Sequence, residues 1–201
     1  MPCGQSGPAL PQRAGSAWLG GLNEHDDRIA ACATLRLTHL RQMSDRLRSM
    51  TEEALAASAK TIIDSNRYMA IGTADESGQP WVTPVWFAHE GYREFVWVSK
   101  PGAQHSLNIA ARPQVAIVIF DSQVSPGSAE AVYMIAAAEE LPADELEPSL
   151  GVFAGESEAQ GLSVWTRDNV VPPARHRLYR ATVREHFVLS PQDERLPVNL
   201  G

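Results

Sequence analysis

A group of polar side chains around one predicted turn has the chemical types needed to bind an anion. Two hydroxyls, an amide, an imidazole and an ammonium come from Ser99, Lys100, Gln104, His105 and Ser106. The turn precedes a short segment with helical periodicity, and the free N–H groups and dipole at a helix N-terminus favour negative charge. These features predict a phosphate-sized anion site. A solvated turn before a surface helix with an ordinary polar cap would give the same composition.

A strand, a turn, a short helix and a second strand must position these side chains. Residues 93–98 are rich in β-branched and aromatic side chains and end at turn formers. A helical pattern then covers residues 103–111 and stops before Pro113, because proline lacks an N–H and restricts the residue before it. The apolar run 115–120 is short enough for a buried strand.

The preceding part of the chain predicts a helix followed by a β-hairpin. Ser49 and Glu52 have capping-box spacing at the start of a predicted helix over residues 49–64, whose apolar residues form one stripe. Residues 68–73 predict a strand, and the turn formers at 75–78 join it to a second strand.

Pro84 interrupts this second predicted strand. Proline cannot donate to a β ladder, so the strand must lie at a sheet edge or contain a bulge. A proline that protects an edge from aggregation explains the residue without any ligand. The interrupted hydrogen-bond ladder also leaves backbone groups free to contact a ligand.

Downstream, residues 130–141 predict a long strand. Alternation places Val132, Met134, Ala136 and Ala138 on one of its faces. Tyr133 and Ile135 would lie on the other face.

The remaining segment is less regular. Asp144 with Glu147 can open a second helix, whereas the glycines between residues 151 and 161 leave that stretch unassigned. Trp165 either packs in the core or offers its indole as a stacking surface for a flat ring. Residues 175–189 predict the last strand.

Charge and composition exclude several classes of protein. The formal net charge of −7 over 201 residues argues against a nucleic-acid partner or an anionic membrane surface. Cys3 and Cys32 provide neither a disulfide framework nor a metal-binding pair, and no apolar run approaches the length of a membrane span. The N-terminus lacks the apolar core of a signal peptide, so the sequence predicts a cytoplasmic protein.

Three regions are predicted along the chain. Residues 1–42 form a disordered or weakly structured N-terminal extension, residues 43–190 form one domain, and residues 191–201 form an exposed C-terminal tail. Met43 is an alternative start of the protein, in which case the residues before it are upstream sequence.

Four stretches together resemble a known family: 79–87 (QPWVTPVWF), 95–102 (FVWVSKPG), 105–110 (HSLNIA) and 112–116 (RPQVA). They are similar to the FMN-binding split-barrel family related to pyridoxamine 5′-phosphate oxidase, and the resemblance covers roughly residues 62–188. It implies a mainly β (α+β) fold, a six-stranded antiparallel split barrel with flanking helices. It also implies a homodimer that holds FMN in a groove at the subunit interface.

The same resemblance implies a set of cofactor-binding residues. Thr83 would reach the phosphate or ribityl chain, and the main chain of Val85 and Trp86 would face the ring. In the oxidase pattern an Arg-Lys pair opens the short helix, where this chain has Gln104 and His105. The full predicted set is Thr83, Pro84, Val85, Trp86, Val98, Ser99, Lys100, Gln104, His105 and Ser106.

The function implied is an FMN-dependent oxidoreductase acting on a small-molecule substrate that the sequence does not name. The alternatives are a reductase that uses the deazaflavin F420, and a non-catalytic flavin- or haem-binding protein. No nucleophile elbow, dinucleotide fingerprint or metal-ligand spacing competes with this interpretation. A bound flavin would supply the redox chemistry, so the absence of an obvious acid or base is expected.

Overall fold

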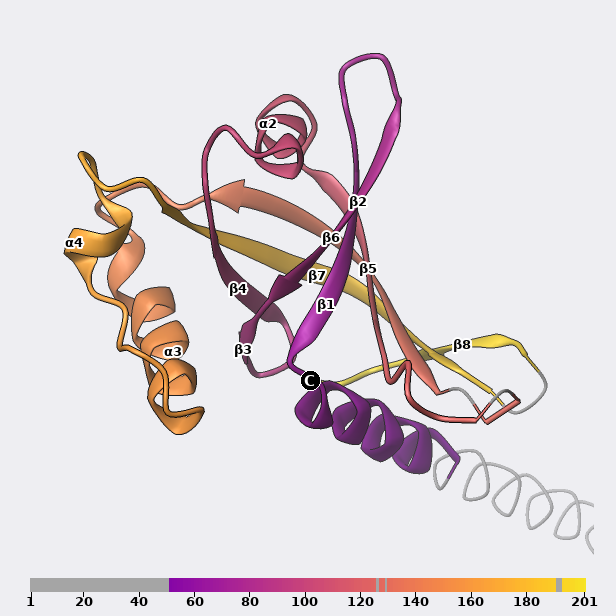
Figure 1. The fold of residues 1–201 in the computed structure, drawn as a ribbon. Helices are drawn as coiled ribbons and strands as arrows, with labels where there is room; N and C mark the ends of the chain where they lie inside the picture. The colour runs from indigo at the N-terminus through magenta and orange to yellow at the C-terminus, as the bar shows by residue number, and fades with distance from the viewer. Residues whose placement is uncertain (1–50, 126, 129, 191–192) are drawn as a thin grey trace, which may run out of the picture. The chain divides into compact units, whose positions relative to one another are not determined.

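The computed structural model describes residues 51–125, 127–128, 130–190 and 193–201. Residues 51–65 are helical, and eight strands and three further helices follow within the described part of the chain (Figure 1). In chain order these are β1 (Tyr68–Ala74), β2 (Pro80–Trp86), β3 (Ala88–Glu90), β4 (Glu94–Ser99), α2 (Gln104–Ala111), β5 (Gln114–Phe120), β6 (Ala131–Glu140), α3 (Leu146–Ala159), α4 (Arg167–Val170), β7 (Arg177–Leu189) and β8 (Arg195–Val198).

The described strands form one antiparallel sheet in the order β2-β1-β5-β6-β7-β4-β3, with β8 beside β7. Only Phe87 separates β2 from β3, so one stretch of chain pairs with β1 at Trp86 and with β4 at Ala88. Taken as a single strand, β2–β3 completes a six-stranded path, and β8 lies outside it. The predicted mainly β, antiparallel split-barrel class with flanking helices is confirmed.

Strand β2 lies at an edge, as Pro84 predicts. Pro84 lies opposite Ala70 of β1, and no described strand pairs with the other side of β2. Its missing N–H therefore costs no ladder hydrogen bond on that open side.

The main core fills the inside of the curved sheet. Of the two faces that alternation predicts for β6, the one that includes Val132 and Met134 is buried. Ala59, Ile62 and Ile63 of the first helix pack into the same cluster, which confirms the predicted apolar stripe of that helix. Burial of these side chains is the main stabilising term, at about 1.5 to 3 kcal/mol for each large one.

A second, smaller core lies beneath α3, which lies beside α4 in Figure 1. Leu146, Leu150 and Phe153 are spaced at i, i+4 and i+7 and pack against β3, β4 and β7 through Ala88 and other residues. Glycines 151 and 155 lie on the exposed side of α3 and do not interrupt this apolar stripe. The stretch left unassigned by the sequence is therefore mostly helix.

The C-terminal residues differ from the exposed tail that the sequence predicts. Strand β8 pairs with the end of β7, from His186 opposite Val198 to Leu189 opposite Arg195. Leu200 is only 4% exposed and belongs to the main core. Residues 195–198 have the alternating pattern of a half-buried strand, but the proline and the shortness of this segment make the strand hard to predict from the sequence.

Several predictions lie outside the described residues: the Ser49 capping position, the extension over 1–42 and the beginning of the 43–190 domain. In the described part of the chain, no helix has the length and apolar character required to cross a membrane.

Candidate functional site

A groove of about 650 Å³ lies between edge strand β2, the end of β4, the start of α2 and the segment that follows α3. Its walls combine apolar rings with a few polar side chains, the usual make-up of a small-molecule site. Most of the predicted cofactor residues line it: Thr83, Pro84, Val85, Trp86, Val98, Ser99 and His105.

Three predicted residues do not line this groove. Lys100 is exposed in the turn before α2, and the Gln104 amide donates to Asn108 Oδ1 at 2.8 Å. Ser106 is buried and lines a different cavity of about 380 Å³, together with Tyr179. Successive helical residues point about 100° apart, so residues 104, 105 and 106 cannot all face one ligand. The roles of these three residues in cofactor binding stay predictions.

The polar end of the groove is built around a Ser99–His105 contact. Ser99 Oγ lies 2.8 Å from His105 Nε2, and the His105 side chain is 5% exposed. Burial lowers the pKa of His105, so the imidazole is neutral near pH 7. Helix α2 has no side-chain hydrogen bond at its N-cap, Ala103. A neutral imidazole, a hydroxyl and the N–H groups of the first helical turn are therefore gathered together.

Helix α2 is held in place by a buried polar chain. Asn108 Nδ2 donates to Thr73 Oγ1 at 3.0 Å, and the Thr73 hydroxyl donates to the Trp81 carbonyl at 3.3 Å. These contacts connect α2 to the β1–β2 hairpin and thus fix the position of His105. The sequence analysis missed Thr73 and Asn108, because neither carries a motif of its own.

A row of rings forms the apolar wall of the groove. The Trp86 and Phe153 centroids are 4.6 Å apart at 68°, and those of Phe153 and Trp165 are 6.0 Å apart at 69°. His176 continues the row, 5.6 Å from Trp165 and nearly perpendicular to it. Trp165 is half-buried, packing on the second core while also lining the groove, and its use as a stacking surface stays a prediction.

Other polar groups lie along the groove. Thr83 is half-buried, and its hydroxyl accepts the Trp81 indole N–H at 2.8 Å. Arg67, exposed just before β1, contributes a permanent positive charge. Gln160 reaches the groove from the end of α3. The sequence analysis missed Phe153 and Gln160, because the stretch containing them had no assigned structure.

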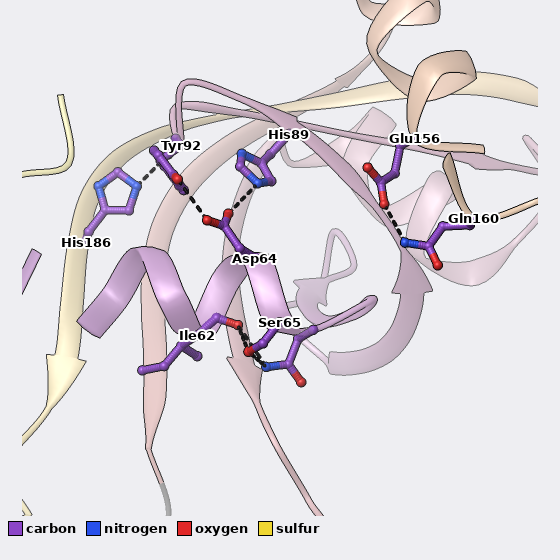
Figure 2. A network of polar contacts seen from close by, with 9 residues as sticks. Ile62, Asp64, Ser65, His89, Tyr92, Glu156, Gln160 and His186 are labelled. Carbon is purple, nitrogen blue, oxygen red and sulfur yellow. Dashed lines mark hydrogen bonds and ion pairs between the residues drawn. The ribbon is translucent and has the colours of Figure 1, made fainter. Parts of the chain in front are cut away.

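A second polar cluster joins the first helix to the β3–β4 turn and to β7 (Figure 2). Asp64 accepts the His89 Nε2–H at 3.1 Å and the Tyr92 hydroxyl at 3.0 Å. His186 Nε2 donates to the Tyr92 carbonyl at 2.7 Å. Tyr92 has a φ of 58°, a left-handed conformation that is unfavourable for a bulky residue, and these contacts hold it there. None of these four residues lines the groove.

Comparison with known proteins assigns the family. The family model described as pyridoxamine 5′-phosphate oxidase matches residues 55–187. The chain belongs to this family. The matched range runs from the first helix into β7 and includes β2, β4 and α2.

Solved structures share the fold at low sequence identity. A haem-binding protein from Mycobacterium smegmatis is 19% identical with a TM-score of 0.58, over 73% of this chain and 58% of that one. The haem storage protein HutZ from Vibrio cholerae is 20% identical with a TM-score of 0.54, over 64% of this chain and 90% of that one. The chain thus spans little more than half of the mycobacterial protein. No curated protein sequence matches it significantly.

Proposed function

We propose that this family member binds FMN in the groove and is an FMN-dependent oxidoreductase. The observation that carries the proposal is the arrangement along one groove of an aromatic wall, an open strand edge and a neutral Ser99–His105 pair at a helix start. The volume of about 650 Å³ lies within the range of about 300 to 1,000 Å³ typical of cofactor and ligand sites.

The groove residues suit the different parts of this cofactor. Trp86 and Trp165 present flat apolar surface for the ring system. Among the described strands, β2 pairs on one side only, so backbone groups on its open side are free to hydrogen-bond the ring edge. Ser99, His105 and the first turn of α2 suit the phosphate. When bound, the flavin would supply hydride and electron transfer, while these residues bind and orient it.

The protein is also proposed to be a homodimer. An apolar hollow of about 600 Å³ on the sheet includes Val82, which is 65% exposed, and Ile135, which is 44% exposed. Val82 lies in β2, next to Thr83 of the groove, so a second copy covering this hollow would border the cofactor site. Light scattering at micromolar concentration should give twice the monomer mass, and Val82→Glu should halve it. A monomeric wild-type protein would contradict the proposal.

Haem binding is the second candidate function, and His176 is the residue that favours it. His176 lines the groove, and its imidazole has no hydrogen-bond partner among the described residues. A free imidazole beside apolar rings is a suitable axial ligand for haem iron. The two structural neighbours are described as haem-binding and haem storage proteins, although their low identity supports only a shared fold.

Titration with three cofactors distinguishes these functions. Purified protein is mixed separately with FMN, F420 and hemin, and absorbance and flavin fluorescence are followed. The proposal predicts saturable FMN binding and reduction of the bound flavin by a nicotinamide nucleotide. Tight F420 binding without FMN binding would support the deazaflavin alternative. A Soret shift that His176→Ala abolishes, without any flavin binding, would support the haem protein.

A further inference from the structure

We propose that Gln160 recognises the ring N–H of the bound flavin, and that Glu156 positions the Gln160 side chain for this contact. The proposal rests on FMN binding in the groove and adds the residue that selects the ring system. Both residues belong to the end of α3, which forms one wall of the groove.

The main chain at Gln160 is held rigidly. Its N–H donates to the Glu156 carbonyl at 3.1 Å, and Gly161 follows in the left-handed conformation with a φ of 69°. Gly161 N–H donates to the Glu158 carbonyl at 2.9 Å, and Leu162 N–H to the Ser157 carbonyl at 2.8 Å. This pair of bonds is the Schellman motif that closes helix C-termini. Gln160 therefore projects from a fixed point.

The side-chain amide has one orientation. Gln160 Nε2 lies 2.9 Å from Glu156 Oε1, and a carboxylate can only accept, so the amide NH₂ must face Glu156. Figure 2 shows the carboxamide oxygen on the opposite side, pointing away from the carboxylate. No described residue donates a hydrogen bond to this oxygen. Gln160, a half-buried residue that lines the groove, therefore carries an oriented acceptor.

An oriented acceptor beside aromatic rings complements a planar heterocycle that carries an N–H at its edge. An oxidised isoalloxazine has one such ring donor, the imide N3–H, and a deazaflavin ring retains it. Haem has no outward N–H, because its four nitrogens face the iron. Gln160 thus favours flavin-type rings over haem.

The experiment compares FMN with its N3-methyl derivative, which retains the ring, ribityl chain and phosphate but lacks the N3–H donor. A neutral hydrogen bond contributes about 0.5 to 1.5 kcal/mol, so the wild-type protein should prefer FMN by roughly three- to tenfold. Gln160→Leu should remove this preference. Fluorescence titration gives each affinity, and thermal melting checks that every variant is folded.

Two further variants separate hydrogen bonding from steric exclusion of the methyl group. Glu156→Gln keeps the size of both side chains but no longer forces the Gln160 amide NH₂ toward residue 156, so the preference for FMN should fall. Glu158→Gln removes a charge from the same helix at an exposed position outside the groove and should leave the preference unchanged. A preference that persists in both Gln160→Leu and Glu156→Gln would overturn the proposal.

The experiment distinguishes failure of the Gln160 contact from failure of FMN binding itself. If wild-type protein binds FMN and its N3-methyl derivative equally well, Gln160 has no recognition role and FMN binding stands. If wild-type protein binds neither compound, the proposed function fails and the role of Gln160 fails with it.

Discussion

Replacement of His105 tests how the groove would hold the FMN phosphate. Burial lowers the pKa of this imidazole in the free protein, where it lies 2.8 Å from Ser99 Oγ. A phosphate at the start of α2 would favour the protonated imidazole, so FMN binding should take up a proton. The affinity for FMN should therefore rise as pH falls, whereas riboflavin, which lacks the phosphate, should show no such trend.

The size of this effect follows from the hydrogen bond that would form. A charge-assisted hydrogen bond contributes about 1.5 to 3 kcal/mol, which corresponds to roughly ten- to a hundredfold in affinity. Uptake of one proton changes the affinity by at most about tenfold per pH unit. Phosphate esters bind their own second proton near a pKa of about 6, so the useful range is about pH 6.5 to 8.

Fluorescence titration with FMN and riboflavin at several pH values gives the ratio of the two affinities. His105→Asn should lower this ratio and remove its pH dependence. Lys100→Ala is the matched control, because Lys100 is exposed and does not line the groove, and its effect should stay below about fivefold. A pH-independent ratio that His105→Asn leaves unchanged, together with a large loss in Lys100→Ala, would refute the reasoning and support the Lys100 site that the sequence predicts.

Three predictions concern the stability of the fold. Gly161→Ala should cost about 1 kcal/mol in urea unfolding, because φ is 69° there and no neighbouring atom lies within 4 Å of an added Cβ; an unchanged midpoint would contradict the helix-end geometry. Burial raises the pKa of Tyr179 to about 12, so the folded state keeps its proton while the unfolded state loses it, and up to about 2 to 3 kcal/mol of stability should be lost between pH 10 and 12. Tyr179→Phe should remove that loss, and identical alkaline unfolding of both proteins would be evidence against it. Asp64→Ala should lower stability by about 1 kcal/mol through loss of the His89 and Tyr92 contacts, with an unaltered thermal midpoint as the contrary result.

Local patterns in the sequence predict the sheet well. Alternation along β6, turn residues after β1 and the proline in β2 each depend on interactions between near neighbours or on a single backbone constraint. The pattern of α3 is harder to detect, because Gly151 and Gly155 suggest a loop unless the Leu146–Leu150–Phe153 stripe is recognised. Strand β8 is too short to be predicted reliably and depends on β7 for its hydrogen bonds.

The predicted residues that line the groove lie on one side of it. Residues on β2, β4 and α2 are close in sequence and carry the family pattern, so they could be identified together. Phe153, Gln160 and His176 reach the same groove only through the packing of α3 and the start of β7. Lys100, Gln104 and Ser106 do not line the groove with His105, because Lys100 lies in the turn before α2 and the other two lie on either side of His105 along the helix.

The most direct test of the proposed function is titration of FMN into the purified 201-residue protein, followed by absorbance and fluorescence. The structure leads us to expect saturation with one FMN per chain, with quenched fluorescence and a shifted flavin spectrum, because the ring would lie against Trp86 and Trp165. FMN that remains fully fluorescent and free in solution at tens of micromolar protein would contradict the proposal.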